Sequence, residues 1–335
     1  MKKLVSLVVV CFFAQFVFAE ISTTVVTQPN QSQIEKQPQQ DPFQENLNKL
    51  QSNDPAVRRQ AAENLGRARR VEAIPYLIKL LKDPDQFVRS TTVDSLGLLR
   101  AKEAADEISN LLVKDESSQV RQSAAIALGY INERKVIPNL IKGLDDKEIG
   151  IKFACIQTLG ILRSSEAVPV FLKYLKEDDV NLKRSVLNAL GMIGNTSILA
   201  DIRNILNDKD PNVRAEAIRV INTLNDQDST QKLIELLKDQ DSRVRTMAAV
   251  TLAKFGNNSG LSVAKIEIEN KDSIIRIQAL QTIDLIGDKT CIPLLTQLLN
   301  KEQDPFIKQR IQQTLNILKT KYPPETPSKS IKKKK

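Results

Sequence analysis

Nine positively charged side chains recur at an almost constant interval, each directly after a Val, Ile or Leu. The intervals are 31 or 32 residues throughout. A row of evenly spaced guanidinium and ammonium groups could bind a chain of carboxylates or phosphates. The nine residues are Arg58, Arg89, Arg121, Lys152, Lys183, Arg214, Arg245, Arg276 and Lys308. The role of these nine cations depends on the helices that carry them. The interval of 31 or 32 residues is typical of a solenoid whose units pack only against their neighbours.

Each unit reads as two antiparallel helices. In the first unit Asp54 is a favourable N-cap, and Pro55 fits the first helical position. Apolar residues then follow at helical spacing until Gly66, where we expect the chain to loosen, and a second helix starts near Pro75. The sequence therefore predicts an all-α fold, a right-handed α-solenoid of about nine two-helix repeats over residues 42–320.

A helical wheel indicates the direction of the nine cations. When the apolar anchor is placed at 0°, the apolar positions centre near 60° and the cation falls at about 100°, only about 40° from that centre. Its stem is thus expected to enter the seam between helices. There its charge would meet a carboxylate, such as the capping Asp four residues earlier or one on the neighbouring repeat. This favours a structural ladder over a track that binds anionic ligands.

The opposite side of the same helices holds positions two, three and six after the anchor. Over nine repeats these positions contain four basic and three acidic residues among 27. Such a mixed, mostly uncharged surface suits a protein or peptide better than a polyanion. Four apolar residues stand out in two adjacent pairs, either as scattered exposed residues without a role or as anchors for a partner. They are Ile126, Phe153, Met247 and Ile277.

The two ends of the chain differ from the array. Residues 1–19 combine a short basic start, an apolar run and a small-residue cleavage pattern, and they read as a signal peptide. The alternative interpretation, an uncleaved membrane anchor, needs a longer apolar run. Lipidation of Cys11 is disfavoured because Val10 precedes the cysteine where a small residue would be expected. Residues 20–41 read as a disordered Gln-rich linker and residues 321–335 as a disordered basic tail. We therefore expect an exported protein, periplasmic or extracellular.

The charge of the chain resides largely in these ends. The formal net charge is +9, from 49 basic and 40 acidic residues. Ten of the basic and four of the acidic residues lie before residue 42 or after residue 318, and the segment between is left with about +3. This argues against nucleic acid as a partner. The tail Lys332 to Lys335 could still make a weak contact with an anionic lipid or wall surface.

The repeats resemble HEAT repeats, specifically the short type found in phycobilisome-lyase-like proteins. The matching pattern is Asp, two variable residues, Val-Arg, then Ala-Ala and Leu-Gly, as in the helix from Asp54 to Gly66. The resemblance implies that the Val-Arg helix lines the concave side and that the Pro-Leu-Leu helix lies outside. It is specific for fold and poorly specific for function.

The resemblance also suggests an enzymatic alternative. Phycobilisome lyases and deoxyhypusine hydroxylase are HEAT proteins, and the latter holds a di-iron centre with His-Glu pairs. This chain contains no histidine, so those motifs have no counterpart, and Cys155 and Cys291 occupy positions that are mostly Ala in other repeats. We predict a non-catalytic scaffold without catalytic residues, cofactor or metal, whose partner is a protein or peptide. A lyase-like or oxidoreductase-like enzyme or accessory subunit is the alternative, and the sequence does not indicate an oligomeric state.

Overall fold

The computed structural model describes residues 41–323, and within this range all regular elements are helices. The expected signal peptide, the linker as far as residue 40 and most of the basic tail lie outside the described residues. One helix, α1 (Pro42–Lys49), precedes the first full repeat. The all-α solenoid predicted from the sequence is confirmed.

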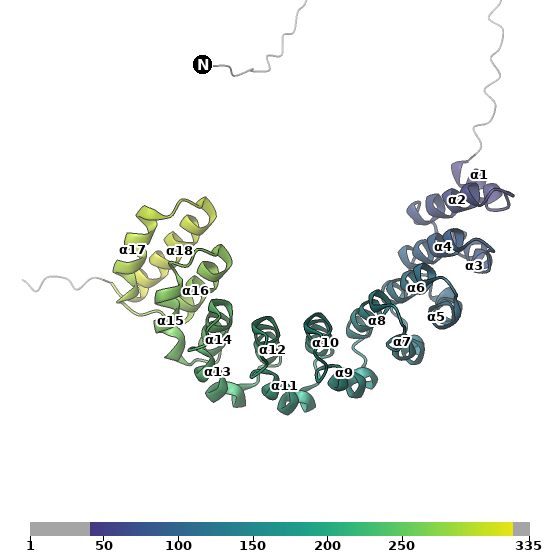
Figure 1. Cartoon of the computed structure of the whole chain (residues 1–335). Coiled ribbons are helices and arrows are strands. Elements are labelled where there is room, and N and C mark those ends of the chain that lie inside the picture. Colours follow the sequence, from purple (N-terminus) through teal and green to yellow (C-terminus); the bar gives the residue numbers. More distant parts are fainter. Residues whose placement is uncertain (1–40, 324–335) are drawn as a thin grey trace, which may run out of the picture. The chain divides into compact units, whose positions relative to one another are not determined.

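The helices that carry the Val-Arg pairs form one layer. Consecutive members of this layer contact each other along the array, and Figure 1 shows them on the inner side of the curve that residues 41–323 follow. They are α2 (Pro55–Arg67), α4 (Gln86–Leu98), α6 (Ser118–Ile131), α8 (Ile149–Ile161), α10 (Val180–Ile193), α12 (Pro211–Thr223), α14 (Ser242–Lys254), α16 (Ser273–Ile286) and α18 (Pro305–Lys321).

The second helices of the repeats form the outer layer (Figure 1). Most are short, with seven residues. They are α3 (Ile74–Leu80), α5 (Ala105–Lys114), α7 (Ile137–Gly143), α9 (Val168–Tyr174), α11 (Leu199–Ile205), α13 (Thr230–Leu236), α15 (Leu261–Glu267) and α17 (Cys291–Lys301). Nine inner helices lie in the described range, eight of them followed by an outer helix, and the expectation of about nine repeats is confirmed.

The predicted N-caps explain where the inner helices begin. Asp85 accepts hydrogen bonds from the backbone N–H groups of Phe87 and Val88, at 2.8 and 3.0 Å. Such caps satisfy amides that have no partner inside the helix. Side-chain caps are present at Asp54, Asp85, Asp179, Asp210, Asp241, Asp272 and Asp304. Ser117 and Glu148 make no such bond.

The glycines nine positions after the anchor do not end the helices, contrary to the sequence interpretation. Gly66 lies inside α2 and is buried. A Cβ on Gly97 of α4 would lie 2.9 Å from the Ala127 Cβ of α6. These glycines therefore allow neighbouring inner helices to approach closely.

The turn after each of the first seven inner helices contains a residue with left-handed backbone geometry, twelve positions after the anchor. Gly and Asn fill it in four repeats, as expected for positive φ. Arginine fills it in the other three, with φ of 53° at Arg69, 51° at Arg100 and 49° at Arg163. This conformation costs a residue with a Cβ roughly 1 kcal/mol or more. Sterics alone do not account for arginine there.

The core is divided into two hydrophobic clusters. The larger runs from Leu47 to Leu252, and the smaller from Ala264 to Leu318. Cys155 and Cys291 are fully buried free thiols, one in each cluster. Burial raises the pKa of the Cys155 thiol to about 12. Both cysteines therefore fill small positions in the core.

Candidate functional site on the inner helix layer

Four of the ladder arginines bind acidic residues that lie 25 or 26 positions later in the chain. Arg58 Nε and Nη2 donate to the carboxylate of Asp83 at 2.7 and 2.8 Å. Arg89 does the same to Asp115 at 2.8 and 2.9 Å. Arg121 pairs with Asp146, and Arg214 with Asp239. Each acidic residue lies in the link that leads to the next inner helix, so each pair connects one repeat to the following one. Of the two partners that the sequence interpretation offered, the capping Asp is not used, and the carboxylate comes from the link to the neighbouring repeat.

The remaining guanidinium nitrogen of each of these arginines, Nη1, donates to backbone carbonyls in the link that precedes its helix. Arg89 Nη1 donates to the carbonyls of Asp83 and Pro84 at 2.9 and 3.1 Å. The carboxylate of Asp83 meanwhile holds Arg58. One acidic residue thus joins two successive arginines, and the pattern repeats through Asp115 to Arg121. Arg89 and Arg121 are only 9% and 8% exposed, so these guanidinium groups are not displayed to solvent.

Three of these carboxylates, those of Asp83, Asp146 and Asp239, have a lowered pKa, which favours their charged form. Burial raises the pKa of Asp83, but hydrogen bonds from Arg58 and from the Asp85 backbone N–H outweigh it and bring the pKa below its ordinary value. The same balance lowers the pKa of Asp146 and Asp239. A charged bidentate pair is stronger and more directional than a neutral hydrogen bond.

The rest of the ladder is less regular. Lys183 pairs with Asp208 at 2.6 Å, Arg245 pairs with Glu267, and Arg276 pairs with Glu302. Lys152 makes no ion pair with any residue between 41 and 323. Lys308 is exposed. The connection from repeat to repeat is therefore interrupted at the fourth repeat.

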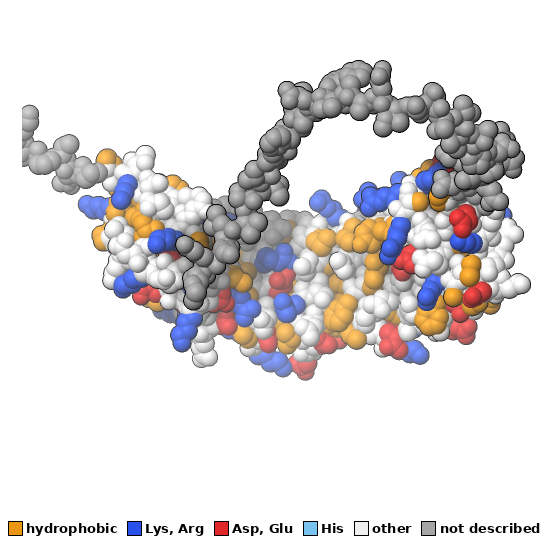
Figure 2. Space-filling view, turned by 90° about the horizontal axis from the view of Figure 1, so that it is seen from above, with side chains coloured by type: hydrophobic (Ala, Val, Ile, Leu, Met, Phe, Trp, Pro, Cys, Tyr) orange, Lys and Arg blue, Asp and Glu red, His pale blue; other side chains and the backbone are white. Residues whose placement is uncertain are grey.

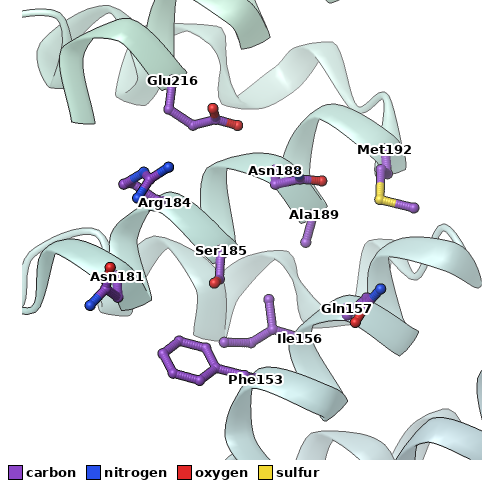
Figure 3. A pocket seen from close by; sticks show the side chains of 10 residues that line it. All are labelled: Phe153, Ile156, Gln157, Asn181, Arg184, Ser185, Asn188, Ala189, Met192 and Glu216. Carbon is purple, nitrogen blue, oxygen red and sulfur yellow. The ribbon is translucent and has the colours of Figure 1, made fainter. Parts of the chain in front are cut away.

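An open hollow lies between α8 and α10 on the inner layer, close to this interruption. Its volume is about 450 Å³, within the range of about 300–1,000 Å³ typical of ligand pockets. Figure 3 shows Phe153 and Ile156 of α8 along one side and Ser185 and Ala189 of α10 opposite them. We call it the α8–α10 hollow.

The α8–α10 hollow combines an apolar base with a polar rim. Ile156 and Ala189 are each 1% exposed, and Phe153 is partly buried against the core. The rim carries amides and one charge of each sign, Arg184 and Glu216. Such a combination fits an apolar side chain of a partner whose backbone is hydrogen-bonded by the rim.

A second hollow, of about 400 Å³, lies between α6 and α8 and contains Ile126, which is 44% exposed. We call it the α6–α8 hollow. Gln157 lines both hollows. The structure therefore brings Ile126 and Phe153, the first predicted pair, into adjoining hollows.

The second predicted pair, Met247 and Ile277, is placed differently. Both side chains are partly buried and pack against the core, Met247 against the larger cluster and Ile277 against the smaller one. Neither lines any of the hollows described for residues 41–323. Their contacts are those of core residues.

Two sets of residues escaped the sequence interpretation. The first is the acidic partners of the ladder, although all of them except Glu267 stand two positions before the next cap residue, as in Asp83-Pro84-Asp85. The second is a row of exposed apolar residues at the ends of the inner helices, ten positions after the anchor. Both sets recur at fixed positions in the repeats, but the repeat period alone does not indicate which residues they contact.

The remaining chemistry of the described range is sparse. No group of three or more His, Cys, Asp or Glu side chains within residues 41–323 is arranged to hold a metal ion. In the same range, no helix is both long enough and apolar enough to cross a membrane.

The family of the chain follows from sequence comparison. The HEAT-repeat family model matches residues 43–128, 105–191 and 199–266. These segments cover more than half of the chain, and the chain therefore belongs to the HEAT-repeat family. The family expected from the Val-Arg pattern is confirmed. No curated protein matches the sequence.

One solved structure with a TM-score above 0.5 shares the fold. The X-ray structure of YibA from E. coli is 21% identical, covers 79% of this chain and 97% of its own, and has a TM-score of 0.53. An engineered protein is 19% identical, with coverage of 83% and 89% and a TM-score of 0.46. The complex of CpcE and CpcF of phycocyanin lyase from Nostoc sp. PCC7120 is 23% identical, with coverage of 87% and 100% and a TM-score of 0.37. At these identities the likeness concerns the fold alone.

Proposed function

We propose that this HEAT-repeat protein is an exported, non-catalytic scaffold that docks a segment of a protein partner along its inner helix layer. The observation that supports this most is the α8–α10 hollow, which combines a buried apolar base with a polar rim that carries one charge of each sign. HEAT-type solenoids present extended surfaces of this kind, and a few anchored side chains dominate binding at such surfaces. In this proposal Phe153 and Ile126 form the walls of the first anchor points.

The nine-cation ladder has a structural role in this proposal. Arg58, Arg89, Arg121 and Arg214 are saturated by carboxylates and backbone carbonyls between repeats. An anionic ligand would have to displace these partners. The proposal therefore assigns partner binding to the open hollows and inter-repeat rigidity to the ladder.

The enzymatic alternative rests on the family resemblance. A lyase-like or oxidoreductase-like role would need reactive groups, yet the chain has no histidine and its Cys155 thiol is buried with a raised pKa. A chromophore or metal that copurifies with the protein from its host in a fixed ratio would support that alternative and contradict the scaffold proposal.

The hollow can be tested with two variants of different design. Phe153→Glu places a charge in the wall, but Phe153 also packs against the core, so some stability is lost as well. Asn188→Trp instead fills the hollow from an exposed position on α10. We expect both variants to weaken partner binding at least tenfold, because they exclude the anchor side chain. The measurement is a pull-down from the host, in which the amount of partner captured by each variant is compared with the amount captured by the wild-type chain.

The matched control is Ile266→Glu, at a 73% exposed apolar residue of the outer helix α15. Binding is expected to persist in this variant. If Asn188→Trp retains its helical circular dichroism spectrum and binds the partner as the wild type does, the α8–α10 hollow is not the binding site.

A further inference from the structure

A row of exposed apolar side chains runs across the ends of four successive inner helices. The row consists of Leu98, Tyr130, Ile161 and Met192, which are 50%, 54%, 41% and 39% exposed. Each stands ten positions after its anchor, whereas the next two repeats have Thr223 and Lys254 there. Figure 2, which looks at the inner side, shows hydrophobic side chains next to Lys and Arg over the N-terminal half of the array. The row is continuous over repeats two to five, and Leu285 and Ile317 hold the same position in repeats eight and nine, where they are 46% and 49% exposed.

Arginines in strained turns border this row. Arg69 and Arg100 have positive φ, in a turn position that Gly194, Gly256 and two asparagines occupy elsewhere. Both arginines are exposed, and neither forms an ion pair with a residue between 41 and 323. A side chain kept at a position that favours Gly or Asn indicates a function that offsets the strain.

Three residues of the row, Leu98, Tyr130 and Ile161, and the two arginines line a pair of hollows that share Arg100 and Tyr130. A hollow of about 400 Å³ between α4 and α6 is lined by Arg69, Leu98, Arg100 and Tyr130, among others. Arg100 and Tyr130 also line the α6–α8 hollow, together with Ile161. No Asp or Glu lines either hollow. This pair of hollows is thus apolar with unbalanced positive charge.

We propose that this pair of hollows binds an acidic, apolar segment of the protein partner, with apolar side chains entering the hollows and carboxylates pairing with Arg69 and Arg100. The inference rests on the proposed function and adds the chemistry of the partner. Charge complementarity selects carboxylates, and the apolar row selects a protein over a nucleic acid. Neighbouring inner helices lie about 10 Å apart, and an extended chain advances about 3.3 Å per residue. The segment is therefore extended, with an apolar residue at about every third position.

A displayed library of random peptides, about a dozen residues long, provides the probe. The full-length chain is the bait, and the enriched peptides are sequenced. We expect enrichment of peptides with net negative charge and apolar residues at about every third position. Enrichment of neutral or basic peptides, or no enrichment at all, overturns the proposal.

The most enriched acidic peptide is then labelled and titrated with variants by fluorescence anisotropy. Arg69→Gly combined with Arg100→Gly is expected to weaken binding about tenfold or more. The same variant should melt at a temperature equal to or above the wild type, because glycine relieves the left-handed conformation. The control is Asn225→Gly, which changes the same turn position in a repeat where Thr223 replaces the apolar residue of the row. This variant should leave peptide binding unchanged.

Three outcomes separate this inference from the proposed function. If the double-glycine variant binds the acidic peptide as the wild type does, the arginine assignment fails. If a labelled single-stranded oligonucleotide competes through the same two arginines, the row binds phosphates and the proposal fails. A third result is that the wild-type chain captures a host partner, Asn188→Trp loses it, and no acidic peptide binds. The proposed function then stands, and this inference alone is wrong.

Discussion

Arg89 contacts three segments of the chain at once, its own helix and the links on both sides. Arg89→Met would leave the carboxylate of Asp115, whose side chain is 4% exposed, buried without its cation. The carbonyls of Asp83 and Pro84 would also lose a donor. Breaking a buried pair in this way costs about 3–5 kcal/mol. Arg89→Lys should cost less, because Lys183 shows that lysine still reaches its acidic partner at this position.

Urea unfolding of the two Arg89 variants measures this difference. The control is Lys102→Met, which removes an ion pair with Glu133 whose lysine side chain is 70% exposed. Such a surface pair contributes about 0–1 kcal/mol. Equal losses for Arg89→Met and Lys102→Met would show that the ladder does not stabilise the array.

The direction of the ladder residues could be deduced from the sequence, but their partners could not. Helical geometry places Arg89 near the apolar stripe wherever the helix occurs. Its partner Asp115 lies 26 positions away, and its position depends on how the second helix returns the chain. The same limit applies to Met247, because exposure near the edge of a helix face depends on how closely the neighbouring helix packs.

The inner helices show which features of an element are local and which depend on packing. Asp caps, the apolar period and the proline positions are local signals, and they predicted the helix pairs well. The role of the glycines is not local. Gly66 was expected to loosen the chain, yet Gly66 and the equivalent Gly97 lie inside their helices, and a Cβ on Gly97 would lie 2.9 Å from the Ala127 Cβ of α6. The hollows that contain Phe153 and Ile126 likewise arise between helices.

Two glycine variants with opposite expected signs test this packing. In Gly97→Ala the new Cβ would lie 2.9 Å from Ala127 Cβ, and overpacking of this kind costs about 1–3 kcal/mol. In Gly191→Ala the nearest atom is Val220 Cγ2 at 3.7 Å, an ordinary contact. There alanine should stabilise the helix by about 0.5–1 kcal/mol. Thermal unfolding that shows the same sign for both would contradict the close-approach role of Gly97.

The whole array combines a rigid frame with a small number of irregular sites. The ladder and the core repeat from unit to unit, whereas the α8–α10 hollow lies next to a departure from the ladder. Lys152, which has no ion-pair partner in the described range, directly precedes Phe153. The division of the core between Leu252 and Ala264 is a second departure. The regular helix pairs and their core could be predicted from the sequence, whereas the residues that line the hollows could be identified only in the structure.

Site-specific photocrosslinking in the native host tests the central claim most directly. A photoreactive residue at Asn188, in the α8–α10 hollow, is compared with one at Ile266, on the outer layer. The scaffold proposal predicts that position 188 crosslinks to one defined segment of an exported protein and that position 266 does not. Crosslinks to cytoplasmic proteins would contradict export. Equal crosslinking at both positions, or none at position 188, would contradict a partner-binding inner layer.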